Sequence, residues 1–360
     1  MIIYAIETSC DETAVAVLEA GRGRLKVLAS EISSQVKLHA RWGGVVPNLA
    51  AREHLKNIVP VFESARKKAG PSAQQPDLLA VTAGPGLIPA LLVGTNFART
   101  LAYVKKVPLL GIHHIEGHIY ANLIDKSNVR FPLLALVVSG GHTQLILMTD
   151  HFQYRIVGQT LDDAAGEAFD KVARILGLSY PGGPIVSRLA AKFLQDKQTA
   201  ARLRLSELGP KLPRPMIGSK NLNFSFSGLK TAVLYLVKKI PAAEVKDLTP
   251  AICAEFQQAA IDVLVAKTLA AAREFQPQTI ILAGGVSANT ELRRQLSECI
   301  ARHLPATDYH VPEMAYSLDN AAMIAAAAYF RWQRLAPAER RQCRENWRTV
   351  QARADLGLSE

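Results

Sequence analysis

The sequence predicts an α/β fold made of two duplicated lobes, and three observations support this prediction. The chain has 360 residues, which exceeds the size that one hydrophobic core usually serves. Hydrophobic residues make up 49% of the chain and charged residues 20%, as in ordinary globular proteins. One order of elements also occurs twice: a hairpin, a helix, a buried strand, a glycine-rich loop and another helix. A small single module and a wholly disordered chain are therefore both excluded.

Each half of the chain opens with a predicted hairpin, in which two apolar, β-branched runs flank a short polar turn. The runs are residues 2–6, 13–18, 133–138 and 143–148. The turn of the first hairpin is the acidic and hydroxyl-rich stretch Glu7–Glu12, and the turn of the second is Ser139–His142. Both hairpins thus place polar side chains at the ends of apolar strands.

A buried strand, a glycine-rich loop and a helix follow in each half. The predicted strands are 78–82 and 279–282, the loops 83–86 and 283–289, and the helices 91–104 and 290–302. Glycine lets backbone N–H groups approach an anion, and the N-terminus of a following helix favours negative charge. Four glycine turns, at Gly84–Gly86, Ser139–Gly141, Gly182–Gly183 and Gly284–Gly285, predict a nucleotide phosphate bound in the cleft between the lobes. None of them has the P-loop pattern.

The predicted domain boundaries follow from proline and from charge. Phe131-Pro132 separates a lobe of residues 1–130 from a lobe of residues 131–330, because the residue before proline is disfavoured in a helix. The second lobe contains a basic insertion around residues 192–220, and residues 331–360 form a basic C-terminal tail.

Positive charge is concentrated in these last two segments. The chain has 42 Lys and Arg against 31 Asp and Glu, a net charge of +11, of which residues 192–220 carry +5 and residues 331–360 carry +3. Such clustering favours a surface that binds a polyanion, with an ordinary solvated surface as the alternative.

The four cysteines lie far apart and include no C-x-x-C pair, which argues against a disulfide framework and fits a reducing compartment. The first residues lack the basic segment and cleavage site of a signal peptide, and no apolar run is long enough to span a membrane. We therefore expect a cytoplasmic protein without a membrane partner.

His114 and His118 are the first candidates for a metal site. On a helix, residues four apart lie on one face, so both imidazoles can reach one ion. A carboxylate commonly completes such a site, and the best candidate is Asp319, directly before a long Ala-rich helix, with a helix N-cap as its alternative role. Glu116 lies about 200° around the helix from His114 and points away, which argues against an H-E-x-x-H metalloprotease.

Polar residues in the second lobe have open roles. Asp163, Glu167 and Asp170 share one face of a predicted helix, either as solvated surface or as contacts to sugar hydroxyls. Ser227 precedes another predicted helix and is a candidate for its cap.

Eight segments together resemble the bacterial form of the universal tRNA threonylcarbamoyladenosine-forming enzymes, formerly called O-sialoglycoprotein endopeptidases. They occur in the family's order: Ile6–Thr13, His113–His118, Val138–Thr143, Asp163–Lys171, Tyr180–Pro184, Asn223–Lys230, Gly284–Asn289 and Asp319–Asn320. The similarity extends over residues 1–335. It implies the actin-like, Hsp70-like and sugar-kinase-like ATPase fold, with the active site in the cleft between the lobes.

The resemblance also implies an activity, the transfer of a threonylcarbamoyl group from threonylcarbamoyl-AMP to N6 of adenosine 37 in tRNAs that read ANN codons. It implies that His114, His118 and Asp319 bind one divalent metal ion per subunit, Fe²⁺ or Zn²⁺. The implied positions that bind threonylcarbamoyl-AMP or ATP are Val137, Val138, Ser139, Gly140, Gly141, Asp170, Gly183 and Asn289. Asp11 and Glu12 are both candidates for removing a proton from the adenine amine. The sequence departs from the family at Ser187, where an Asp is frequent.

The partners that the resemblance implies are tRNA, a paralogous TsaB-like dimerisation subunit, a small TsaE-like ATPase, and a TsaC-like enzyme that supplies the adenylate. Two other functions compete with acyl transfer. A plain ATPase or kinase of the same fold would explain the glycine turns but not the two histidines with Asp319. A non-catalytic partner subunit should have lost that set of residues, which is intact here.

Overall fold

The chain packs as two compact units. The computed structural model describes residues 1–21, 24–124, 129–195 and 211–358. Unit 1 comprises Met1–Val129, Asp150–Tyr154 and Pro312–Glu360, and unit 2 comprises Arg130–Thr149 and Arg155–Val311. Residues 312–360, which the sequence predicts to be divided between the second lobe and a tail, thus pack in unit 1. Residues 196–210 of the predicted basic insertion lie outside the described residues.

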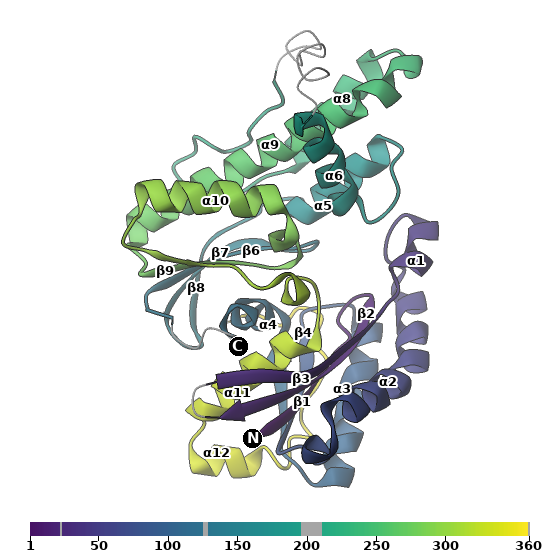
Figure 1. The fold of residues 1–360 in the computed structure, drawn as a ribbon, viewed down its shortest axis with the longest axis vertical. Helices are drawn as coiled ribbons and strands as arrows, with labels where there is room; N and C mark the ends of the chain where they lie inside the picture. Colours follow the sequence, from purple (N-terminus) through teal and green to yellow (C-terminus); the bar gives the residue numbers. More distant parts are fainter. Residues whose placement is uncertain (22–23, 125–128, 196–210, 359–360) are drawn as a thin grey trace. The chain divides into compact units, whose positions relative to one another are not determined.

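Two five-stranded sheets form the framework of the two units (Figure 1). The first sheet contains β1 (Ile2–Glu7), β2 (Glu12–Gly21), β3 (Arg24–Ser34), β4 (Leu78–Gly84) and β5 (Leu109–His113). The second contains β6 (Leu133–Val138), β7 (Thr143–Asp150), β8 (Gln153–Gln159), β9 (Thr279–Ala283) and β10 (Asp308–His310). Their orders, β3-β2-β1-β4-β5 and β8-β7-β6-β9-β10, are the same, which confirms the predicted duplication. In each sheet the opening hairpin is antiparallel, and the two later strands add in parallel.

Helices cover both faces of the first sheet. α2 (Pro47–Ala69) and α3 (Ile88–Lys105) pack on one face, and α11 (Ala321–Arg334) with α4 (His114–Tyr120) beside it packs on the other. A sheet covered on both faces requires strands without an exposed side, and every residue of β4 is buried. Two short helices, α1 (Val36–His39) and α12 (Pro337–Gln342), complete unit 1.

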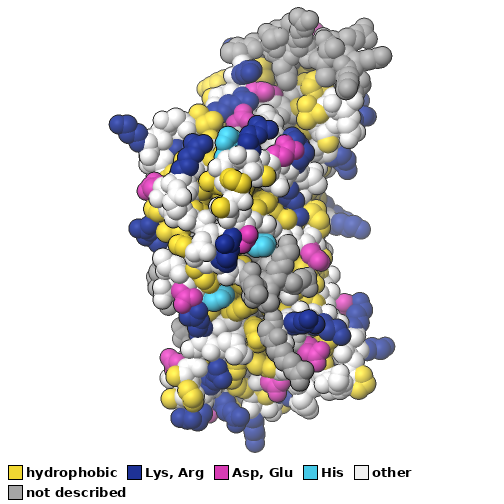
Figure 2. Space-filling model, turned by 60° about the vertical axis from the view of Figure 1, so that its left-hand side comes forward, with side chains coloured by type: hydrophobic (Ala, Val, Ile, Leu, Met, Phe, Trp, Pro, Cys, Tyr) yellow, Lys and Arg dark blue, Asp and Glu magenta, His cyan; other side chains and the backbone are white. Residues whose placement is uncertain are grey.

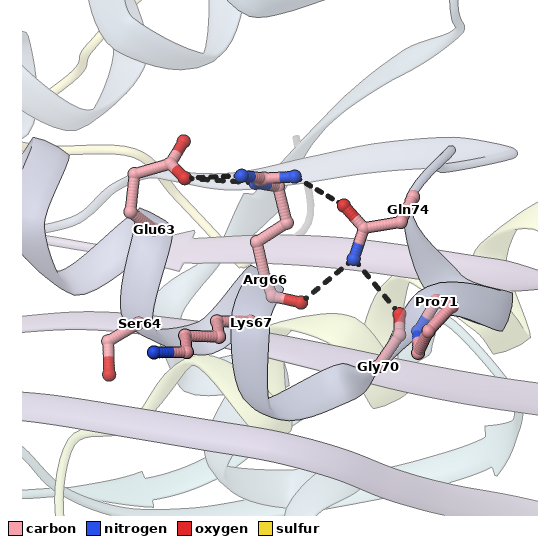
Figure 3. A pocket seen from close by; sticks show the side chains of 7 residues that line it. All are labelled: Glu63, Ser64, Arg66, Lys67, Gly70, Pro71 and Gln74. Atoms are coloured by element: carbon pink, nitrogen blue, oxygen red, sulfur yellow. Dashed lines mark hydrogen bonds and ion pairs between the residues drawn. The ribbon is translucent and has the colours of Figure 1, made fainter.

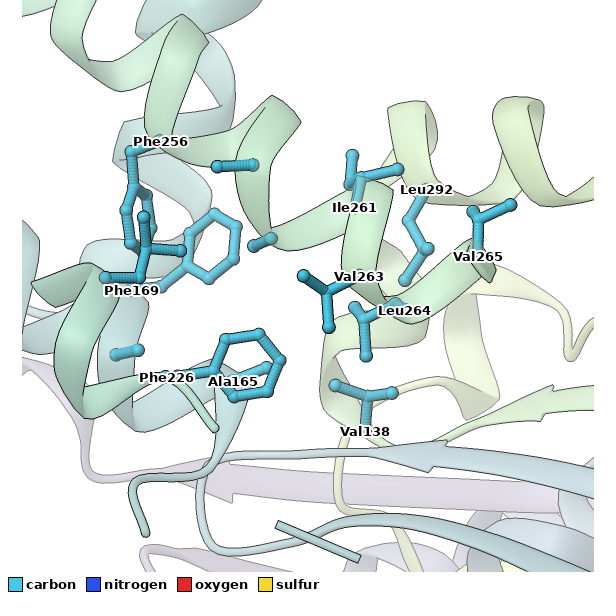
Figure 4. Close-up of a cluster of buried hydrophobic side chains, with 14 of the residues drawn as sticks. Val138, Ala165, Phe169, Phe226, Phe256, Ile261, Val263, Leu264, Val265 and Leu292 are labelled. Carbon is cyan, nitrogen blue, oxygen red and sulfur yellow. The ribbon is translucent and has the colours of Figure 1, made fainter. Parts of the chain in front are cut away.

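The core of unit 2 lies between its sheet and five helices. These are α5 (Ala165–Ile175), α6 (Gly182–Gln195), α8 (Ser227–Lys239), α9 (Ala242–Phe275) and α10 (Thr290–His303). Figure 4 shows the centre of this core, in which Phe169 and Phe256 meet edge to face with ring centroids 4.9 Å apart. Val138, at the end of β6, belongs to the same buried cluster, so the core fixes the point from which the second glycine turn starts.

Within the described residues, none of the helices has the length and apolar character that a membrane crossing requires.

A polar pocket beside the end of α2 holds none of the predicted site residues (Figure 3). Arg66 lies between Glu63 and Gln74 and bonds to both, with its Nε 3.0 Å from Glu63 Oε2. Gln74 Nε2 also donates to the carbonyl oxygens of Arg66 (3.3 Å) and Gly70 (3.0 Å). These bonds fix the end of α2.

The N-terminus of α8 is capped by Asp162 and not by Ser227, so the predicted cap is wrong. Asp162 Oδ1 accepts hydrogen bonds from the backbone N–H groups of Phe226 (2.8 Å) and Ser227 (3.2 Å). Ser225 Oγ donates to the other oxygen of Asp162 at 2.5 Å. The side chain of Ser227 makes no capping bond. The cap comes from a residue 65 positions earlier in the chain, which a local motif cannot indicate.

Replacement of Asp162 by alanine is expected to lower the free energy of unfolding by about 1 kcal/mol, because two backbone N–H groups lose their acceptor. Ser227→Ala is the matched control and should leave stability nearly unchanged. Urea denaturation followed by circular dichroism measures both. Equal losses in the two variants would contradict this assignment of the cap.

Candidate functional site

The carboxyl ends of three neighbouring parallel strands bring the candidate residues of unit 1 together. β1 ends at Glu7, β4 ends at Gly84, and β5 ends at His113, directly before α4. His113 is the N-cap of α4, because its Nδ1 accepts a hydrogen bond from the N–H of Ile115 at 3.1 Å. α4 therefore starts at the edge of the sheet, with His114 as its first residue.

His114, His118 and Asp319 offer one ligand atom each, and these atoms lie within 4.8 Å of one another. Asp319 Oδ1 is 3.2 Å from His118 Nε2 and 3.5 Å from His114 Nε2. An ion bound at about 2.0–2.1 Å holds tetrahedral ligand atoms about 3.3 Å apart, so both separations fit a shared metal. His118 is buried, and neither of its ring nitrogens has a hydrogen-bond partner among the described residues. The three side chains thus fit a metal ion.

Asp319 is not the N-cap of α11. Asn320 holds that position, and its Oδ1 accepts a hydrogen bond from the N–H of Met323 at 2.9 Å. Of the two roles that the sequence leaves open for Asp319, the structure assigns the cap to its neighbour and places the Asp319 carboxylate against the two histidines.

Glu7 is a buried carboxylate beside His114 that is not among the predicted site residues. Its Oε2 lies 3.0 Å from His114 Nδ1 and accepts a hydrogen bond of 2.6 Å from Thr82 Oγ1. Burial raises the pKa of Glu7, but His114 and Thr82 outweigh burial and hold it below its usual range. Burial lowers the pKa of His114, but Asp319 and Glu7 raise it to about 9. A carboxylate at the last position of a buried strand is the sequence signal that marks Glu7.

Replacement of Glu7 by glutamine is expected to lower metal affinity by about 10- to 100-fold, because Glu7 orients His114 through Nδ1. Glu19→Gln, at an exposed position of β2, is the matched control. Competition of each protein with a chelator for Zn²⁺ gives the affinities. Equal affinities of the Glu7 variant and the control would show that Glu7 does not support the metal ligand.

Glu116 lies away from the two histidines, as the helix geometry predicts. Its carboxylate is buried and pairs with Arg331 Nη2 at 2.5 Å. The arrangement of an H-E-x-x-H metalloprotease, with a glutamate beside a metal-bound water, is therefore not formed by α4.

Asp11 and Glu12 form an acidic pair where β2 begins. Burial, Asp11 and Asp319 together raise the pKa of Glu12 to about 9. Ser34 Oγ donates to Glu12 Oε1 at 3.0 Å. Asp11 Oδ2 is buried and has no hydrogen-bond partner among the described residues. The two carboxyl groups therefore differ in environment.

The predicted glycine turns of unit 2 meet at the carboxyl ends of β6 and β9. Val137 and Val138 end β6, and Ser139–Gly141 follow. Gly284, after β9, has a φ of 85°, and a Cβ there would lie 2.5 Å from the carbonyl oxygen of Val138. Gly166, in the first turn of α5, donates to the carbonyl oxygen of Ser139 at 3.2 Å. The second turn is thus held by close backbone contacts, as backbone binding of an anion requires.

Gly140 and Gly141 are exposed, and a Cβ at either position would meet nothing within 4 Å. Gly183, in the first turn of α6, is equally open. Asp170 Oδ1 accepts a hydrogen bond from the N–H of Gly182 at 2.7 Å, which fixes the start of α6. Asp170 and Gly183 therefore lie close together.

The predicted acidic face of Asp163, Glu167 and Asp170 is not continuous. Asp163 precedes α5 and pairs with two lysines at 2.8 Å each. Glu167 pairs with one of these lysines, also at 2.8 Å. Asp163 lies two residues before the helix, and of the three acidic residues Asp170 is the one that bonds to a glycine turn, at the N–H of Gly182.

Asn289 is the N-cap of α10. Its Oδ1 accepts hydrogen bonds from two backbone N–H groups of α10 at 3.0 Å each. Its Nδ2 donates to Ser187 Oγ and to Gln257 Oε1 at 2.9 Å each. The structure thus places Ser187, the position that departs from the family pattern, directly against Asn289.

Comparisons with known proteins identify one group of relatives. A family model described as TsaD, tRNA N6-adenosine threonylcarbamoyltransferase, matches residues 26–326. A protein of that name from Nitrosospira multiformis is 45% identical over 364 aligned residues, which cover 100% of this chain and 99% of the relative. Another protein of that name, from Thermosipho melanesiensis, is 48% identical over 329 aligned residues, which cover 91% of this chain and 94% of the relative. Among solved structures, a ROK family glucokinase from Streptomyces griseus matches 92% of this chain and 100% of its own, with 11% identity and a TM-score of 0.49.

Proposed function

Since the chain belongs to the TsaD family of tRNA N6-adenosine threonylcarbamoyltransferases, we propose that it performs this transfer with a divalent metal ion held by His114, His118 and Asp319. The chain is a transferase of threonylcarbamoyladenosine biosynthesis, and its two duplicated units have the actin-like fold of the family. The geometry of the three ligand atoms is the observation that carries the metal-dependent part of this proposal.

Two imidazoles and a carboxylate suit Zn²⁺ and Fe²⁺ alike. When bound, the ion supplies Lewis-acid polarisation of an oxygen of the threonylcarbamoyl donor. Glu7 holds Nδ1 of His114, so that Nε2 of this imidazole faces Asp319. The chain's own residues thus fix the orientation of the ligands before any ion binds.

The glycine turns of unit 2 bind the adenylate in this proposal. Backbone N–H groups of Ser139–Gly141 bind its anionic part, where the open space at Gly140 and Gly141 admits a ligand. Asp170 and Asn289 hydrogen-bond the nucleoside. Because Oδ1 of Asn289 caps α10 and its Nδ2 donates to Ser187 and Gln257, a hydrogen bond from Asn289 to the nucleoside replaces one of these two Nδ2 bonds.

Asp11 is the residue that we assign to proton removal from the adenine amine. Its Oδ2 is buried without a hydrogen-bond partner among the described residues, whereas Glu12 Oε1 accepts a hydrogen bond from Ser34 and burial raises the pKa of Glu12. In the transfer, N6 forms a bond to the carbonyl carbon of the donor. The bond from that carbon to the phosphate oxygen breaks, AMP leaves, and the amine proton passes to Asp11.

A groove between α2 and α3 accepts the paralogous TsaB-like subunit in this proposal. It is lined by Leu55, Ile58, Leu92, Val93, Asn96, Phe97 and Thr100. The side chains of Leu55 and Leu92 are 65% and 46% exposed, an unusual state for large apolar residues on neighbouring helices.

tRNA is the substrate of the family, and the TsaE-like ATPase and the TsaC-like enzyme follow from family resemblance. All four cysteines are free thiols, which fits the expected cytoplasmic location.

Joint replacement of Leu55 and Leu92 by aspartate is expected to abolish co-purification of the chain with its TsaB-like partner, because two charges would be buried in the interface. Leu161→Asp, at another exposed leucine, is the control and should leave assembly intact. Retention of the complex in the double variant would place the partner on another surface.

The transfer itself is tested by incubating the chain with threonylcarbamoyl-AMP, its bacterial partners and unmodified tRNA that reads ANN codons. Mass spectrometry of digested tRNA should show threonylcarbamoyladenosine. Absence of this product together with steady ATP hydrolysis without tRNA would favour a plain ATPase or kinase of the same fold.

A further inference from the structure

The C-terminal segment of residues 336–358 lies along β5, the edge strand of the first sheet. At its start, the carbonyl oxygen of Cys343 accepts a hydrogen bond from the N–H of Leu109 at 3.0 Å. Asn346 Nδ2 donates to the carbonyl oxygen of the same leucine, also at 3.0 Å. The segment therefore covers an edge strand that would otherwise be open to pairing.

The other end of the segment reaches the start of the metal-bearing helix. The N–H of Arg353 donates to the carbonyl oxygen of Ala83, at the end of β4, at 2.8 Å. His113 Nε2 lies 3.0 Å from the carbonyl oxygen of Leu356. Because Nδ1 of His113 already accepts the capping bond of α4, Nε2 carries the proton and donates it to Leu356. The segment thus runs along β5 from Leu109 to the residue before His114.

An aromatic contact fixes the segment to the end of α3. The rings of Tyr103 and Trp347 have centroids 4.7 Å apart, and Arg99 Nε donates to the carbonyl oxygen of Trp347 at 2.7 Å. The guanidinium of Arg348 lies over the Trp347 ring, 4.8 Å from its centroid. Tyr103 remains 59% exposed, and Lys105 and Lys106 follow it directly. The basic end of α3 and the C-terminal segment therefore form one continuous surface.

This surface is positively charged. Residues 336–358 contain five arginines and three acidic residues. Its exposed basic side chains are Lys105, Lys106, Arg341, Arg344, Arg348 and Arg353. Arg348 Nε lies 3.3 Å from Glu345 Oε2, and both side chains are 65% exposed. Because solvent screens such an ion pair, it neutralises little of this charge. On the face drawn in Figure 2, Lys and Arg are spread out with Asp and Glu between them.

We propose that this basic surface binds backbone phosphates of the substrate tRNA and so holds it on unit 1, along the edge strand β5, whose far end leads into the helix that carries His114 and His118. The proposal rests on the proposed function, since the partner it names is the tRNA to be modified. The family model ends at residue 326, so the match does not include the segment. Contacts between basic side chains and phosphates position a nucleic acid without reading its sequence, so the surface serves every tRNA substrate equally.

The test compares two triple variants of the full chain in the reconstituted transfer reaction. In the first, Arg341, Arg344 and Arg348 are replaced by glutamine. In the matched control, Lys239, Arg273 and Arg302, which are exposed on helices of unit 2, are replaced by glutamine. We expect the first variant to raise KM for tRNA about tenfold at unchanged kcat, and to reduce the slope of log affinity against log salt by about two to three. The control should keep both values.

A third variant, with lysine at positions 341, 344 and 348, should restore the affinity, because a phosphate contact needs charge rather than a particular side chain. An unchanged KM in the glutamine variant, or an equal loss in the control, would overturn the proposal. Loss of partner assembly with unchanged affinity for tRNA would also overturn it and would make this surface a protein-docking site. Filter binding measures tRNA affinity independently of transfer activity, so failure of this proposal can be told apart from failure of the proposed function. His114→Ala should lose transfer but keep its tRNA affinity.

Discussion

Replacement of His114 by alanine is expected to lower kcat for threonylcarbamoyl transfer by at least about a thousandfold, a loss of roughly 4 kcal/mol in the transition state. The substitution removes one of two imidazoles that face Asp319 and leaves Thr82 as the remaining partner of the buried Glu7 Oε2. Single-turnover rates with threonylcarbamoyl-AMP, measured together with the metal content of the variant, check this result.

His303→Ala, at an exposed position of α10, is the matched control and should leave both the rate and the metal content unchanged. Asp319→Asn keeps the size of the side chain and removes only its charge, so it separates loss of a ligand from loss of folding. A His114 variant that is folded, free of metal and fully active would refute the assigned role of the three ligands.

Replacement of Gly166 by alanine is expected to lower the affinity for an adenine nucleotide by about 100-fold, or roughly 3 kcal/mol. A Cβ at this position would lie 2.6 Å from the carbonyl oxygen of Ser139 and 2.9 Å from Cα of Gly140. Because both contacts are with backbone, the turn that we assign to the adenylate must move. Calorimetric titration with ATP or threonylcarbamoyl-AMP gives the affinity.

Gly218→Ala adds the same methyl group at an exposed position of unit 2 that has no assigned role in ligand binding and where nothing lies within 4 Å, so this variant should bind the nucleotide within about twofold of the unmodified chain. Strong binding by the Gly166 variant would show that the turn at Ser139 is not part of the nucleotide site.

The features predictable from the sequence are those encoded in short stretches. Apolar runs around polar turns predicted both hairpins, and the spacing of His114 and His118 placed both imidazoles on one helix face. β3 was missed because its burial pattern is irregular, so it lacks the alternation that marks a strand. β10 has only three residues, too few for any periodic signal.

Residues whose role depends on distant partners could not be predicted. Glu7 supports His114 across 107 positions of sequence, so its place at the end of a buried strand marks it as a candidate but does not identify its partner. The N-cap of α11 is Asn320, one residue after Asp319, for which the sequence left this role open. Asp and Asn are both common N-cap residues, so residue type alone does not decide between them. The path of residues 336–358 along β5 rests on backbone hydrogen bonds, which leave little trace in side-chain patterns.

The most direct test of the metal centre is to measure metal content and threonylcarbamoyl transfer on the same preparation, before and after chelation and again after addition of Fe²⁺ or Zn²⁺. We predict one tightly bound ion per chain, loss of transfer when it is removed, and recovery when it is returned. Transfer at the full rate by a chain stripped of metal would contradict the central role of His114, His118 and Asp319.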